Sequence, residues 1–379
     1  MPGFETQAIH AGGEPDPHTG AVVPPISLAT TFAQDGVGRH RGWEYARTAN
    51  PTRAALETCV ATLESARHGF AFASGMAAED AILRLLGPGE GVLLGNDAYG
   101  GTFRLLDKVY APAGNPWAAV DLADPARVHA DWPEGTRVVW LETPTNPALE
   151  IVDIAAVAEI AHAREAFVVV DNTFATPYLT QPLAFGADVV VHSSTKYLGG
   201  HSDVVGGFVA TDDDHIAERL AFVQNAVGAV PSPFDCYLVQ RGVKTLPVRM
   251  DRQCANARLV VEMLLTHPAV ERVLWPGLDE HPGHDVAKRQ MRDYGGMVSF
   301  TVRGGEAAAL AVAEGTELFT LAESLGAVES LIEHPAQMTH ASAAGSPLAV
   351  DPALIRLSVG IETGTDLVAD LEHALAQVG

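Results

Sequence analysis

Short apolar runs alternate with stretches of helical periodicity between residues 70 and 210, and this alternation constrains the fold most strongly. Polar or glycine-containing turns follow these runs, as expected for buried strands that deliver their last residues to a cleft. The runs span residues 70–73, 91–94, 137–142, 167–171 and 188–192. We therefore predict an α/β fold with a mostly parallel, doubly wound sheet and a site at the carboxyl ends of its strands.

The pattern changes on both sides of this region and divides the chain into three predicted parts. Residues 1–55 are rich in Gly, Pro and polar residues, which is typical of an arm that packs on another surface. Residues 56–245 form the large domain, and 206–210 is expected to add an antiparallel edge strand. Residues 246–379 mix helical stretches with antiparallel-looking strands and predict a smaller C-terminal α+β domain.

Charge and cysteine content limit the class of protein. The 379 residues include 47% hydrophobic and 19% charged residues and carry a net charge of −23. Such a chain is globular and repels nucleic acid and anionic membranes. No apolar stretch is long enough to span a bilayer, and the first residues show no signal-peptide pattern. Three cysteines without a Cys-x-x-Cys pair fit a reducing cytoplasm. We expect a cytoplasmic protein that acts on a small molecule.

Lys196 lies in the segment Ser193-Ser194-Thr195-Lys196-Tyr197, which directly follows the last of the five runs. Burial lowers the pKa of a lysine and makes its amine a nucleophile. Two hydroxyls just before Lys196, in Ser193-Ser194-Thr195, and Gly199-Gly200 after it suit a bound phosphate. This segment is therefore typical of a pyridoxal-phosphate Schiff base. Alone, a strand-end lysine is more often a surface residue. Asp171, which ends the preceding run, favours the functional interpretation because a carboxylate there keeps a pyridine nitrogen protonated.

Three further segments offer groups for the same cofactor or its substrate. Ser74-Gly75-Met76 opens a predicted helix whose free amides bind an anion, although Ser74 is also an ordinary helix cap. Tyr99 can stack on a planar cofactor, or serve as a turn tyrosine. Arg356 suits a substrate carboxylate, or a structural salt bridge. Their combination with the lysine segment points to one site. By contrast, two histidines at 281 and 284 lie in a Pro/Gly loop, and no metal site is expected.

Eight ordered segments together match a known pattern. They are residues 45–52, 73–78, 97–102, 142–147, 170–174, 192–203, 324–331 and 356–362. Through them the chain resembles, nearly end to end, the Cys/Met-metabolism pyridoxal-phosphate enzymes. That group includes cystathionine γ-synthase, cystathionine γ-lyase, cystathionine β-lyase and methionine γ-lyase. The resemblance implies the fold of type I pyridoxal-phosphate-dependent transferases, pyridoxal 5'-phosphate as cofactor and an amino acid as substrate.

The resemblance also implies a role for each matching residue. It makes Lys196 the Schiff-base residue, Asp171 the partner of the pyridine nitrogen, and Tyr99 a ring-stacking residue that exchanges a proton. The phosphate contacts are implied for Gly75, Met76, Ser193 and Thr195. The contacts to the substrate carboxylate and cofactor oxygens are implied for Asn146, Ser324 and Arg356.

The same resemblance implies a function for the N-terminal arm. Tyr45 and Arg47 match a pair that reaches the phosphate of a neighbouring subunit. This implies an obligate dimer with shared active sites, usually assembled as a homotetramer. Two departures concern specificity. Ser27 and Leu28 stand where relatives usually carry a Tyr-Gln pair, and Gly101 stands where methionine γ-lyases typically carry a cysteine, which disfavours that activity.

The residues named so far leave two reactions open. The first is α,γ-elimination of L-cystathionine to cysteine, 2-oxobutanoate and ammonia in transsulfuration (cystathionine γ-lyase). The alternative is γ-replacement of O-succinyl- or O-acetylhomoserine by cysteine (cystathionine γ-synthase). Segments 38–45 and 324–331 look more like bacterial γ-lyases, so we expect the lyase. Glu329 resembles a residue associated with γ-chemistry, where it would bind the distal ammonium of cystathionine, although an acid at a helix start is nearly as common. A non-catalytic protein would need a broken set of site residues, and none is missing.

Overall fold

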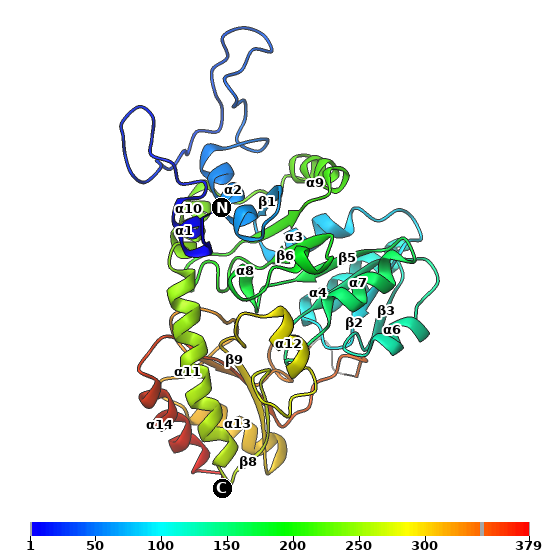
Figure 1. Cartoon of the computed structure of the whole chain (residues 1–379), viewed down its shortest axis with the longest axis vertical. Coiled ribbons are helices and arrows are strands. Elements are labelled where there is room, and N and C mark those ends of the chain that lie inside the picture. Colours follow the sequence, from blue (N-terminus) through cyan, green and yellow to red (C-terminus); the bar gives the residue numbers. More distant parts are fainter. Residues whose placement is uncertain (1, 342–344, 379) are drawn as a thin grey trace.

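The computed structural model describes residues 2–341 and 345–378, which build two sheets arranged along the long axis of the molecule (Figure 1). The larger sheet has seven strands in the order β1-β7-β6-β5-β4-β2-β3, and the smaller has five in the order β10-β11-β12-β9-β8. The predicted α/β class with a mostly parallel main sheet is confirmed.

The seven-stranded sheet is parallel except for one strand. Its strands are β1 (His68–Phe72), β2 (Gly91–Gly95), β3 (Trp117–Val120), β4 (Thr136–Glu142), β5 (Phe167–Asp171), β6 (Val189–His192) and β7 (Gly207–Thr211). Strand β7 is antiparallel to both of its neighbours, β1 and β6. The prediction that this strand forms an edge is wrong, because β1 covers it. Strand β3 was not predicted, since three of its four residues are only half-buried and form no continuous apolar run.

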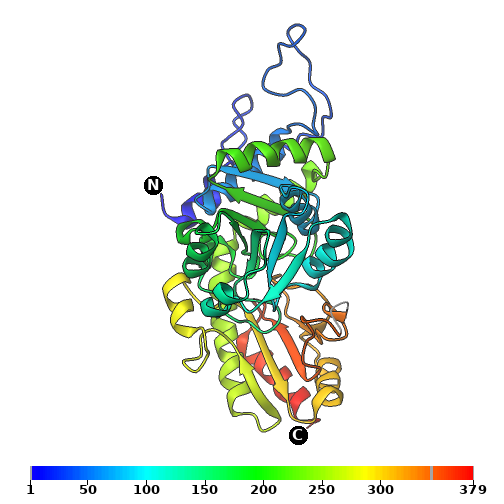
Figure 2. The same cartoon turned by 90° about the vertical axis from the view of Figure 1, so that its right-hand side faces the viewer.

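Alternate residues of the central strands face two different hydrophobic clusters. Val168 and Val170 of β5 pack with Val157 of α7 (Ile154–His162), whereas Val169 packs with Ile82 of α3 (Gly75–Leu83) on the opposite face. Both faces are therefore buried, which explains why these strands read as unbroken apolar runs. Figure 2 shows helices on both sides of this sheet.

The helices of the first 245 residues connect and cover these strands. They are α1 (Phe4–His10), α2 (Pro51–Leu63), α3 (Gly75–Leu83), α4 (Gly100–Leu105), α5 (Ala111–Ala113), α6 (Pro125–Ala130), α7 (Ile154–His162), α8 (Thr176–Leu179), α9 (Asp214–Val227) and α10 (Pro233–Val243), with a π-helical turn at Leu106–Tyr110 and a 3-10 turn at Pro182–Phe185. Several begin as the sequence dictates: Asn50, Asp153 and Asp213 cap α2, α7 and α9 through their side chains.

The smaller sheet follows a long connecting helix, α11 (Leu246–Thr266). Its strands are β8 (Val270–Leu274), β9 (Met297–Val302), β10 (Thr320–Leu321), β11 (Leu331–Glu333) and β12 (Leu354–Ser358), accompanied by α12 (His284–Gln290), α13 (Gly305–Gly315) and α14 (Gly364–Leu375). The predicted domain boundary at 245/246 falls between α10 and α11. The division into arm, large domain and small domain stays a prediction.

The N-terminal segment contributes two loops that project from the body of the molecule (blue in Figures 1 and 2). They expose apolar side chains, with Val22 at 78%, Leu28 at 70% and Val37 fully accessible. Such exposure is unusual for side chains of this kind and marks a surface suited to covering by another chain. Within the described ranges, no helix combines the length and apolar character that a membrane crossing requires.

Candidate active site

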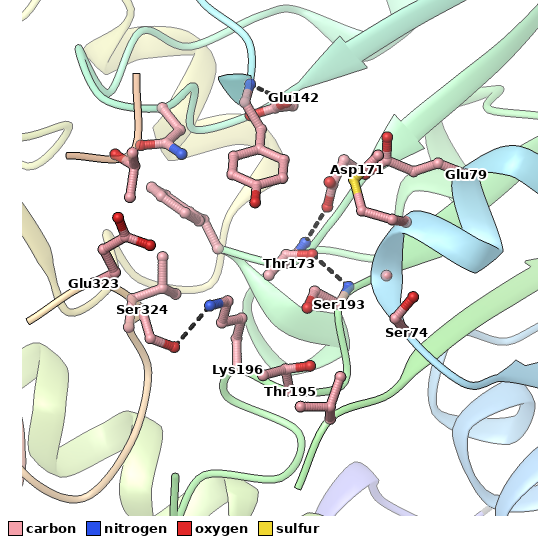
Figure 3. Close-up of a pocket in the computed structure, with 18 of the residues that line it drawn as sticks. Ser74, Glu79, Glu142, Asp171, Thr173, Ser193, Thr195, Lys196, Glu323 and Ser324 are labelled. Atoms are coloured by element: carbon pink, nitrogen blue, oxygen red, sulfur yellow. Dashed lines mark hydrogen bonds between the residues drawn. The ribbon is translucent and has the colours of Figure 1, made fainter. Parts of the chain in front are cut away.

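The segments that follow β1, β2, β4, β5 and β6 meet at the carboxyl ends of these strands and line one cavity of about 300 Å³ (Figure 3). This is where ligands bind in open α/β sheets. Loops of the smaller sheet close its other side. Ten of the predicted site residues line the cavity: Gly75, Met76, Tyr99, Asn146, Asp171, Ser193, Thr195, Lys196, Ser324 and Arg356.

Lys196 points into this cavity and donates a hydrogen bond from Nζ to Ser324 Oγ at 2.7 Å. Burial, and then the positive charge of Arg356, lower the pKa of Lys196 to about 8. Near neutral pH a useful fraction of the amine is therefore unprotonated and nucleophilic. Ser324 has a φ of 93°, a left-handed conformation that costs free energy for a serine and that is common at functional sites.

Asp171 ends β5, and one of its carboxylate oxygens accepts a hydrogen bond from the protein. Oδ1 accepts a hydrogen bond from the Thr173 amide at 2.9 Å. Burial raises the pKa of Asp171, while the Thr173 hydrogen bonds and the charge of His192 lower it. The carboxylate is thus fixed in direction inside a buried site, as pairing with a pyridine nitrogen requires.

The start of α3 forms an anion cradle beside Lys196. Ser74 caps the helix by accepting a hydrogen bond from the Ala77 amide at 3.1 Å, which leaves the preceding amides of Gly75 and Met76 without intrahelical partners. A Cβ atom built on Gly75 would lie 3.0 Å from Ser193 Cβ. Glycine therefore lets the helix end approach the Ser193 segment closely.

Tyr99 precedes α4 and is anchored through its backbone. Its amide donates a hydrogen bond to Glu142 Oε1 at 2.7 Å. Burial raises the pKa of the Tyr99 phenol. A Cβ atom built on Gly101 would overlap with the Tyr99 ring. The ring thus occupies the space that a larger residue at position 101 would need.

Arg356 of β12 is buried and already has three partners. Nη1 donates to Asn146 Oδ1 at 2.8 Å and lies 3.0 Å from Glu333 Oε1, while Nη2 donates to the Ser324 carbonyl at 2.9 Å. Nε is buried without a hydrogen-bond partner among the described residues. A substrate carboxylate suits this remaining donor.

Three predicted residues do not line the cavity. Tyr45 and Arg47 lie on the exposed arm, where the Arg47 guanidinium sits 5.8 Å from the Tyr45 ring centre. Their role toward a neighbouring subunit stays a prediction. Glu329 accepts a hydrogen bond from the Ser202 hydroxyl and is outside the cavity lining. The carboxylate of this loop that does line the cavity is Glu323.

Sequence reasoning missed four acidic residues around the site. Glu79 and Glu142 line the cavity with Asp171, Glu323 lies beside Ser324, and Glu333 pairs with Arg356. Glu142 opens the matching segment 142–147, and Glu323 directly precedes the segment 324–331, so their positions were a usable signal. Glu333 was hidden, because its partnership depends on the register of β11 against β12, where Glu333 faces Arg356.

The cavity residues fit pyridoxal phosphate. A nucleophilic amine, a fixed acid and a glycine-permitted cradle of helix amides and hydroxyls occupy one cavity. This donor set supplies the Schiff-base, ring-nitrogen and phosphate contacts that this cofactor needs.

Comparison with known proteins agrees with this arrangement. The profile of the family described as "Cys/Met metabolism PLP-dependent enzyme" matches residues 5–376. Cystathionine gamma-synthase of Mycobacterium tuberculosis is 58% identical over 375 residues, covering 98% of this chain and 97% of the relative. Cystathionine beta-lyase of Coxiella burnetii is 52% identical over 377 residues, with coverage of 98% and 97%.

A solved structure extends the comparison to three dimensions. Cystathionine gamma-lyase from Lactobacillus plantarum, complexed with L-serine, superposes with a TM-score of 0.96 at 46% identity and covers 100% of this chain and 99% of its own. Fold, cavity chemistry and sequence therefore agree, and the chain belongs to the Cys/Met-metabolism family of pyridoxal-phosphate-dependent enzymes.

Proposed function

We propose that this enzyme is a cystathionine γ-synthase, which replaces the acyl-oxygen substituent of O-succinyl- or O-acetylhomoserine by the sulfur of cysteine. The observation that carries the proposal is the 58% identity with the M. tuberculosis synthase over 98% of the chain. This favours the alternative reaction of the sequence analysis over the γ-lyase expected there. That expectation rested on two short segments.

The residues of the cavity supply the steps that this reaction needs. Bound pyridoxal phosphate withdraws electrons from the substrate Cα and so acidifies its proton. Lys196, with a pKa of about 8, is suited to take up this proton near neutral pH. Tyr99 keeps its phenolic proton because burial raises its pKa, so it is available as a hydrogen-bond donor. Arg356 offers to the substrate carboxylate its Nε, which has no hydrogen-bond partner within residues 2–341 and 345–378.

Glu323 is our candidate for recognition at the far end of the substrate. It lines the cavity next to Ser324, whose hydroxyl contacts Lys196. A carboxylate there suits the ammonium group of the incoming cysteine or of cystathionine. This assigns to Glu323 the role that the sequence analysis gave to Glu329.

A paired assay tests the proposed reaction. Purified enzyme with pyridoxal phosphate is expected to form cystathionine from an O-acylhomoserine only when cysteine is present. Release of 2-oxobutanoate from cystathionine as the faster reaction would support the γ-lyase, and release of pyruvate would support a β-lyase. The γ-lyase remains the second candidate because relatives bearing that name are 46% and 50% identical.

The assembly and compartment follow from the same proposal. We infer that the projecting arms bring Tyr45 and Arg47 to a neighbouring subunit's cavity, within a homotetramer built from two dimers. Their exposure in the single chain supports this inference. Three free, buried cysteines support residence in a reducing cytoplasm.

A further inference from the structure

Three carboxyl groups converge at the end of the cavity that receives the pyridine nitrogen. Glu142 and Asp171 are register partners on the adjacent strands β4 and β5, so their side chains lie on the same face. Glu79 reaches the same place from the first turns of α3, and all three line the cavity. Figure 3 shows Glu79 beside Asp171. The roles assigned so far use only Asp171 and Glu142.

The hydrogen bonds of these groups are unequal. Asp171 Oδ1 is held by the Thr173 amide at 2.9 Å, and Glu142 Oε1 by the Tyr99 amide at 2.7 Å. Glu79 is only 4% exposed, and its Oε2 has no hydrogen-bond partner in the described part of the chain. A buried carboxylate oxygen without a partner is costly, whereas a carboxylic acid can donate a hydrogen bond to a neighbouring carboxylate.

Charge balance decides which of the groups carries a proton. Burial, and then the negative charge of Asp171, raise the pKa of Glu79 to about 8, while the Thr102 hydroxyl and Arg104 lower it. The pKa of Glu142 is also raised, by burial first and by Asp171 second. Burial raises the pKa of Asp171 as well, but the Thr173 hydrogen bonds and then the positive charge of His192 oppose this shift. Of the three, Asp171 is therefore the group best supported as an anion.

We propose that Glu79 is a neutral carboxylic acid that donates a hydrogen bond to the Asp171 carboxylate, and so acts as a positioning residue for the group that faces the cofactor nitrogen. A donor to the charged form keeps Asp171 ionised and fixes its free oxygen in direction. The proposal depends on the cofactor and not on whether the reaction is a synthesis or an elimination.

The first test detects the proton directly. The infrared spectrum of the apoenzyme at neutral pH is expected to contain the carbonyl band of a buried, protonated carboxyl group, which disappears in Glu79→Gln. The band should fade in the wild type as the pH rises through about 8. Asp80→Asn is the matched control, because Asp80 lies next in the same helix but pairs with Arg84 outside the cavity.

The second test separates a donor from an anion. Glu79→Gln keeps a donor of the same shape, and its affinity for pyridoxal phosphate is expected to stay within about twofold of the wild type. Glu79→Leu removes the donor and should bind the cofactor about tenfold more weakly. Circular dichroism and thermal melting exclude a folding defect.

Two results would overturn the proposal. One is the absence of a protonated band assignable to Glu79 near neutral pH. The other is a loss of cofactor affinity in Glu79→Gln as large as that in Glu79→Leu, which would make Glu79 an anion. Because both measurements use the apoenzyme or cofactor binding, they are independent of the reaction assay.

Discussion

Lys196 shows how one side chain acquires its reactivity from its surroundings. Burial and Arg356 lower the pKa of its amine to about 8. Only the neutral amine attacks the cofactor aldehyde, so the rate of reconstitution of the apoenzyme should rise with pH and level off above pH 8. Stopped-flow measurement of the visible absorbance of the bound cofactor gives this profile. A rate that keeps climbing well above that pH, as for an exposed lysine, would contradict the assignment.

Lys196→Ala tests whether this residue is essential. The variant should lose turnover and the covalent cofactor absorbance, while pyridoxal phosphate still binds non-covalently through the α3 cradle. Dialysis should then remove the cofactor from the variant but not from the wild type. Turnover that survives in the variant would exclude Lys196 as the catalytic residue.

Glu323 and Glu329 form a natural matched pair, because they lie on one loop and only Glu323 lines the cavity. Glu323→Gln should lower kcat/KM about tenfold through loss of a charged hydrogen bond to the substrate. Glu329→Gln should stay near the wild type, and the cofactor spectrum should be unchanged in both. Steady-state kinetics with O-acylhomoserine and cysteine checks this. A larger loss of kcat/KM in Glu329→Gln than in Glu323→Gln would assign substrate recognition to Glu329 instead.

Single residues could be predicted from the sequence where they stand beside a strand end or within a matching segment. Lys196, Asp171 and Tyr99 were found in this way. Glu79 was missed because its proposed role depends on Asp171, which lies 92 positions later in the chain. The two residues lie side by side only in the folded chain (Figure 3). The spacing of residues along the sequence does not indicate such a long-range contact.

At the scale of elements, the start of α3 is the most sensitive part of the site. Gly75→Ala adds a methyl group 3.0 Å from Ser193 Cβ, so the helix end must move away from the Ser193 segment. Affinity for pyridoxal phosphate should fall about tenfold, or about 1.4 kcal/mol. Gly87→Ala is the control, since its methyl meets only an ordinary contact at 3.4 Å. Fluorescence titration of the apoenzymes compares the two, and equal affinities would show that the cradle tolerates the shift.

Elements were predictable where burial left a clear pattern. The strands 167–171 and 189–192 are buried on both faces and read as continuous apolar runs. Strand β3 and the position of β7 were not predictable in this way. Strand β3 is short and mostly half-buried. The position of β7 inside the sheet depends on its pairing with β1, a contact between segments far apart in the sequence.

At the scale of the whole molecule, the arm decides whether two chains share their sites. We expect subunits carrying Lys196→Ala, mixed with subunits carrying Arg47→Ala, to regain turnover. A mixed dimer would contain one site in which both residues are native. Mixing after mild dissociation, followed by activity assay, measures this.

The control for this mixing is Lys196→Ala with Asp171→Ala. Both residues line the cavity of the same chain, so every mixed site lacks one of them and no turnover should return. If the Arg47 mixture is equally inactive, Arg47 does not act across the subunit boundary.

The two sheets contribute different groups of residues to the site, and this separation has a consequence for evolution. The cradle, the acid and the lysine come from the seven-stranded half, whereas Glu323, Ser324 and Arg356 come from the half built on the five-stranded sheet. Changes at Glu323 can redirect the enzyme toward another amino acid, whereas changes at Ser324 or Arg356 also alter Lys196, which the first contacts and the second influences by its charge. A lineage with this architecture can therefore explore new substrates at the Glu323 position while the residues around Lys196 stay the same.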